Sequence, residues 1–79
     1  MKELINSQIM LYRQVNDRIR YYCLKIHPTL FAGYILIREY GSEGNRKPTR
    51  VVEEHFNHFE EAFSRLKLIV ARKTKKGYL

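Results

Sequence analysis

Basic side chains are the groups in this sequence best placed to bind a ligand. Six lysines and arginines follow Ala62, and no acidic residue does. On a helix that turns by about 100° per residue, Arg65, Arg72 and Lys76 share one flank. A cluster of cations on one flank suggests an anionic partner: a nucleic acid (DNA or RNA), an acidic protein or an anionic lipid. The alternative is a solvated helix face whose charge serves only solubility.

A glycine-containing turn carries a second group of candidates. Tyr40 ends a predicted strand directly before Gly41, where a base or sugar can stack on the ring and the backbone can approach a phosphate. Arg38 lies two residues earlier and therefore on the same face of the strand. The alternative for Tyr40 is an ordinary half-buried sheet aromatic. Three cations that follow the turn complete the predicted nucleic-acid-binding site: Arg46, Lys47 and Arg50.

Metal-binding and catalytic groups have weaker support. The sequence contains four possible zinc ligands, Cys23, His27, His55 and His58. Their spacing is not that of a usual zinc finger and their positions fall on or beside predicted strands, so we expect no metal. We interpret Cys23 as a small apolar strand residue, not as the nucleophile of a Cys–His pair.

An enzyme is not expected. Glu53 and Glu54 are interpreted as a solvated strand end, and the sequence has no phosphate-cradling glycine motif. So short a chain also leaves little room for a substrate pocket. We therefore expect no catalytic residues and no cofactor.

Length and composition limit the remaining possibilities. The chain has 79 residues, 44% of them hydrophobic, and a formal net charge of +7. This describes one ordinary domain over residues 1–79. A single cysteine excludes an internal disulfide, and the opening residues, MKELINSQIM, have no apolar core typical of a signal peptide. With no apolar run of about 20 residues either, we expect a cytoplasmic protein without a membrane span.

Four segments have the composition and alternation of strands. They cover residues 9–15, 19–26, 34–40 and 49–56. Asn16 and Asp17 indicate a turn, Pro28 should end the second strand, and residues 41–45 should form the third turn.

The last element is predicted to be an amphipathic helix. Its apolar positions have the spacing of one buried face: Phe59, Ala62, Phe63, Leu66, Ile69 and Val70. Asn57 is the expected N-cap and Gly77 the expected stop. Four strands followed by one helix predict an α+β fold, in which a four-stranded antiparallel sheet packs against one C-terminal amphipathic helix.

In this order, the segments RYYCLKI, REYGSEGN and EEAFSRLKLIVARKTKKGY resemble the WGR domain. That family is named for a Trp-Gly-Arg at the end of a central strand, and its last helix ends in a motif similar to Lys73–Tyr78. The segment HPTLFAG is similar to a connection in small stand-alone bacterial members. The resemblance covers residues 9–78 and implies a nucleic-acid-binding module like the WGR domain of poly(ADP-ribose) polymerases.

The signature itself is altered in this chain. Tyr40 stands where the family has tryptophan, Gly41 matches, and Ser42 stands where the family has arginine. In the polymerases, the tryptophan and arginine help to contact a DNA end and neighbouring domains. Tyr40 retains an aromatic face for stacking, whereas Ser42 cannot supply a planar cation.

A protein-interaction domain is the second functional hypothesis. Six tyrosines and four phenylalanines are many for so small a core, and exposed tyrosine favours interfaces. A tyrosine-rich sheet face would then bind a partner protein or a second copy. A membrane-surface role is the weakest hypothesis, because the apolar face of the helix is needed to cover the sheet.

Overall fold

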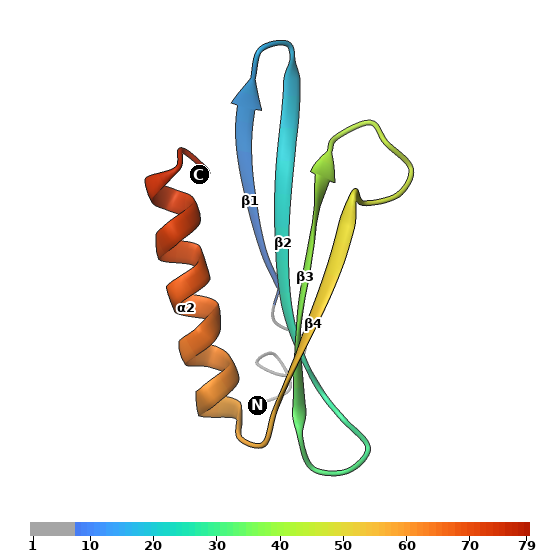
Figure 1. The fold of residues 1–79 in the computed structure, drawn as a ribbon, viewed down its shortest axis with the longest axis vertical. Coiled ribbons are helices and arrows are strands. Elements are labelled where there is room, and N and C mark those ends of the chain that lie inside the picture. The colour runs from blue at the N-terminus through green and yellow to red at the C-terminus, as the bar shows by residue number, and fades with distance from the viewer. Residues whose placement is uncertain (1–7) are drawn as a thin grey trace.

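A computed structural model describes residues 8–79 of the chain. It contains four strands and one helix in the order β1 (Gln8–Val15), β2 (Arg18–Pro28), β3 (Tyr34–Ser42), β4 (Arg50–Phe56) and α2 (Phe59–Lys75) (Figure 1). The prediction that the opening residues are not a signal peptide falls largely on residues 1–7, which lie outside the described part of the chain.

The strands form one antiparallel meander in the order β1-β2-β3-β4. Their register places Tyr22 opposite Tyr40 and Leu24 opposite Arg38 on the two central strands. Three strands are longer than the sequence indicates: β1 begins at Gln8, β2 covers residues 18–28, and β3 continues through Gly41 to Ser42. The prediction that Pro28 ends β2 is confirmed, and Pro28 pairs with Tyr34 there. Pro28 is the last residue of β2, a place where a missing amide donor costs little.

The helix covers one face of this sheet (Figure 1), which confirms the α+β prediction. Leu24 and Leu36 at the sheet centre are fully buried beneath Ala62, Leu66 and Ile69 of α2. The core is small because one helix can cover only the middle of four strands.

One apolar residue of α2 does not have the predicted environment. Phe63 is 42% exposed and stacks on Phe59 with ring centroids 5.7 Å apart, whereas Leu66 is 4% exposed. The helical spacing alone predicted burial for Phe63. The sheet leaves this flank of α2 exposed, so the prediction that Phe63 faces the sheet was wrong.

The two ends of α2 differ from each other in how well the sequence predicts them. The N-cap is His58 and not Asn57, and no side chain caps the first turn. At the other end Gly77 has the expected left-handed conformation, with φ of 103°. The Gly77 amide donates to the Thr74 carbonyl and the Tyr78 amide to the Lys73 carbonyl, which is the Schellman pattern.

The Schellman turn directs the last two residues back to the sheet. Tyr78 is buried in the core, and Leu79 exchanges two backbone hydrogen bonds with Tyr12 of β1, of 2.8 and 2.9 Å. The last two residues are therefore hydrogen-bonded both to the last turn of α2 and to the outer edge of β1. Within residues 8–79 no helix is long and apolar enough to cross a membrane.

Candidate nucleic-acid interface

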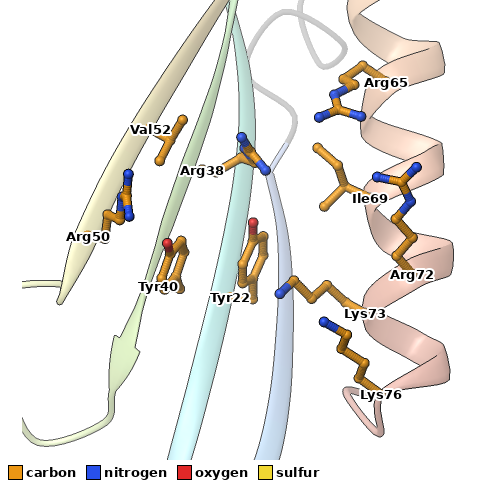
Figure 2. A pocket seen from close by; sticks show the side chains of 10 residues that line it. All are labelled: Tyr22, Arg38, Tyr40, Arg50, Val52, Arg65, Ile69, Arg72, Lys73 and Lys76. Carbon is orange, nitrogen blue, oxygen red and sulfur yellow. The ribbon is translucent and has the colours of Figure 1, made fainter.

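A cleft of about 420 Å³ opens between α2 and the sheet, toward the C-terminal end of the helix. Figure 2 shows side chains from β2, β3 and β4 on one side and from α2 on the other, all directed into this space. Its lining consists of two tyrosines, two aliphatic residues and six cations, here called the basic cleft: Tyr22, Tyr40, Val52, Ile69, Arg38, Arg50, Arg65, Arg72, Lys73 and Lys76.

The charge of the basic cleft is almost unopposed. In the part of the chain that the structure describes, no carboxylate lines it. Among the residues that the structure describes, Arg65 is the only one of the six cations in an ion pair, with its Nε 3.2 Å from Oε1 of Glu54. Within the same residues the buried Nε of Arg38 has no hydrogen-bond partner. A buried donor without an acceptor is uncommon, and an anion in the cleft would supply one.

Aromatic rings form the floor of the basic cleft. Tyr22 and Tyr40 stack with centroids 5.0 Å apart and ring planes within 3°, because they are directly opposite on β2 and β3. Tyr78 approaches Tyr22 edge-on at 6.1 Å. The Nζ of Lys73 lies 4.5 Å from the Tyr22 centroid and 5.7 Å from that of Tyr78. These contacts connect the end of α2 to the stacked pair.

The position of Lys73 changes its titration. Burial lowers the pKa of the Lys73 amine, and the positive charges of Lys76 and Arg38 lower it further. A phosphate in the cleft would reverse the effect of those neighbours by adding negative charge. The cleft is therefore an environment in which binding an anion and binding a proton favour each other.

The altered signature lies at the end of β3. Tyr40 faces the basic cleft, and a side chain at Gly41 would place its Cβ 2.8 Å from the Thr49 amide nitrogen, which explains the need for glycine. Ser42 is 4% exposed and accepts a hydrogen bond of 3.1 Å from Nη1 of Arg20. Arg20 is directly opposite Ser42 in the register, so β2 supplies a guanidinium beside the position where the family has arginine.

The structure brings most of the predicted site residues together. Six of them line the basic cleft: Arg38, Tyr40, Arg50, Arg65, Arg72 and Lys76. Arg46 and Lys47 do not line it; they lie exposed in the β3–β4 connection. Sequence reasoning missed Tyr22, Lys73 and Arg20. The signal for Tyr22 was present, since Tyr22 alternates with Leu24 and Ile26 in the strand predicted over residues 19–26, but its pairing with Tyr40 required the register.

The other chemically active side chains lie away from the cleft. Cys23 is buried on the opposite side of the sheet from its neighbour Tyr22, and burial raises the pKa of its thiol. Nearby Lys25 lowers that pKa and Glu39 raises it, both less than burial does. A protonated thiol is a poor nucleophile. Among residues 8–79, no three histidine, cysteine, aspartate or glutamate side chains gather as metal ligands would.

Comparison with known proteins agrees with this geometry. The sequence profile of the WGR domain family matches residues 7–79. No curated protein and no solved structure matches the chain significantly. WGR domains are a known type of nucleic-acid-binding module, and the match includes every strand, the altered signature and the basic helix. The chain therefore belongs to the WGR domain family.

Proposed function

We propose that this protein is a non-catalytic nucleic-acid-binding module and that the basic cleft is its binding site. The observation that carries the proposal is the convergence of six cations on one cleft. Among residues 8–79, only one of these cations is ion-paired and no carboxylate lines the cleft. Like charges so close together repel one another in the free protein. A phosphate backbone would relieve this repulsion and release counterions from the nucleic acid.

The stacked tyrosines support a nucleic acid over a simple inorganic anion. Tyr40 has one ring face against Tyr22, and it pairs in register with Arg50 of the outer strand β4. A base or sugar placed against Tyr40 would extend the stack beside a guanidinium. Stacking of this kind contributes about 1–3 kcal/mol per base and tolerates any sequence.

The β3–β4 connection extends the proposed site beyond the cleft. Arg46 and Lys47 are exposed there, next to the turn that contains Gly44 with φ of 99°. They have no place in the cleft lining and would contact phosphates of the same backbone further along. Recognition built from phosphate contacts and stacking is general, so we expect weak, sequence-independent binding with little preference for strand ends.

The chemistry of the lining supports the non-catalytic part of the proposal. Among the described residues, the lining has no carboxylate, imidazole or thiol, the groups that most often act as general bases or nucleophiles near neutral pH. The cations and rings that remain are suited to binding.

A salt-dependent titration tests the proposed function. Fluorescence anisotropy would follow binding to labelled duplex, nicked-duplex and single-stranded oligonucleotides of the same sequence over a series of salt concentrations. We expect the logarithm of the association constant to fall linearly with the logarithm of salt concentration on each duplex. Absence of binding even at low salt would refute the proposal, and a strong preference for nicked ends would refute its general character.

A further inference from the structure

Within residues 8–79, no helix lies over the side of the sheet that faces away from α2 (Figure 1). Side chains of successive strand residues point to opposite faces of a sheet. Tyr22 and Leu24 face α2, so the strand residues that alternate with them and with their cross-strand partners form the second surface, here called the open face. Its apolar members include Met10, Tyr12, Ile19, Tyr21, Ile37 and Val51.

The open face is unusually apolar for a solvated sheet surface. Tyr12 and Ile19 are each 41% exposed and Val51 is 50% exposed. Antiparallel sheets with one face in water normally place polar residues there. In the register Tyr12 lies opposite Tyr21 and Met10 lies opposite Cys23, and adjacent apolar side chains of this kind mark interaction sites.

Charge is divided between the two sides of the sheet. By register, all arginines of the four strands lie on the side of the sheet that faces α2: Arg13, Arg18, Arg20, Arg38 and Arg50. Lys25 and two of the three strand glutamates, Glu39 and Glu53, lie on the open face, whereas Glu54 lies on the side that faces α2. Of these, Lys25 and Glu39 pair with each other at 3.4 Å, which leaves Glu53. The open face is therefore slightly acidic, whereas the protein as a whole carries +7.

This division of charge selects the occupant of the open face. A nucleic acid would find no excess of cations there. A second copy of the chain would meet the least repulsion in this arrangement, because both strongly cationic sides then point away from the contact. A twofold axis running along the sheet between β2 and β3 would also place Lys25 of one copy over the strand that carries Glu39 in the other.

The size of the open face fits the same occupant. Four strands at a spacing of about 4.8 Å and a length of about eight residues give a surface of about 19 by 26 Å. Two such surfaces bury about 1,000 Å², the size at which a specific interface begins. A single helix-covered sheet of 79 residues also gains stability from association, because its own core is small.

From these observations we infer that the open face is a homodimer interface in which the sheets of two copies pack face to face. The two basic clefts would then lie on opposite outer sides of the dimer. If the proposed function holds, one dimer would hold two nucleic-acid segments at once. Dimerisation itself does not depend on that function.

Sedimentation velocity without nucleic acid tests the dimer directly. The variant Tyr12→Lys/Val51→Lys places two cations on the open face at exposed positions of the two outer strands. The matched control Leu30→Lys/Phe31→Lys makes the same change at side chains that are 94% and 91% exposed in the β2–β3 connection, outside the face. Thermal melts of both variants show whether each still folds.

We expect the native protein to sediment as a dimer and the control to remain dimeric. The dimer dissociation constant of the open-face variant should be about 100-fold higher than that of the native protein. A native protein that is monomeric at every concentration would overturn the inference, as would dissociation of the control in place of the open-face variant. Because nucleic acid is absent, failure here is distinct from failure of the proposed function. A second experiment tests whether one dimer holds two duplexes at once. Energy transfer between two separately labelled duplexes would report this bridging, and the open-face variant should abolish it.

Discussion

The basic cleft makes a quantitative prediction about salt dependence. The perturbation is the double variant Arg72→Gln/Lys76→Gln, which removes two exposed cations from the cleft wall without touching the core. Its matched control is Lys67→Gln/Lys75→Gln, which removes two exposed cations from the same helix outside the cleft lining. Both variants lose the same net charge, so any difference between them reports position.

The expected magnitude follows from the number of phosphates neutralised. Arg72 and Lys76 have no ion pair within residues 8–79, so each is free to neutralise one phosphate. Each phosphate contributes about 0.9 to the salt slope on duplex DNA, so the cleft variant should lose about 1.8. Between about 50 and 200 mM salt, the native protein should therefore lose about 12-fold more affinity than the cleft variant does. Arg65 is left out because its pairing with Glu54 already offsets its charge.

Anisotropy titrations at several salt concentrations would give the three slopes. The control should keep a slope close to the native one, with only a small general loss of affinity from the lower net charge. Equal changes of slope in the two variants would mean that charge alone matters, and the basic cleft would no longer be the site. A thermal melt of each variant confirms that the fold is intact.

Three further predictions concern the fold and the titration of the cleft. Leu66→Ala should lower the free energy of unfolding by about 2–5 kcal/mol, but Phe63→Ala by only about 1 kcal/mol, since it loses a ring pair and little burial; similar denaturation midpoints for both would contradict this. Gly41→Ala should lower the melting temperature because its Cβ would meet the backbone of Thr49, and an unchanged melt would show that the close approach is dispensable. Bound phosphate should raise the lowered pKa of Lys73, so affinity should fall as pH rises through that pKa. Lys73→Arg keeps its charge, so its affinity should change less over the same pH range; an identical pH profile would exclude Lys73 as the titrating group.

The sequence by itself determined the element types and most of the cations of the site. Alternation with a period of two located all four strands, and the spacing of Ala62, Leu66 and Ile69 located the helix. These patterns are readable because they reflect geometry within one element. The basic flank of Arg65, Arg72 and Lys76 was predictable for the same reason. The helix ends were less predictable from the sequence. Gly77 ends α2 through its own left-handed conformation, as predicted. Asn57 matched a capping pattern, but the N-cap is His58.

Only the tertiary structure decided which residues meet across elements. The Tyr22–Tyr40 stack depends on the β2–β3 register, and the position of Lys73 over Tyr22 depends on how α2 is rotated against the sheet. Phe63 is exposed for the same reason: a helix pattern defines an apolar stripe but not how much of that stripe a narrow sheet can cover. Register and helix rotation are set by the packing of the whole core, and no short stretch of sequence contains that information.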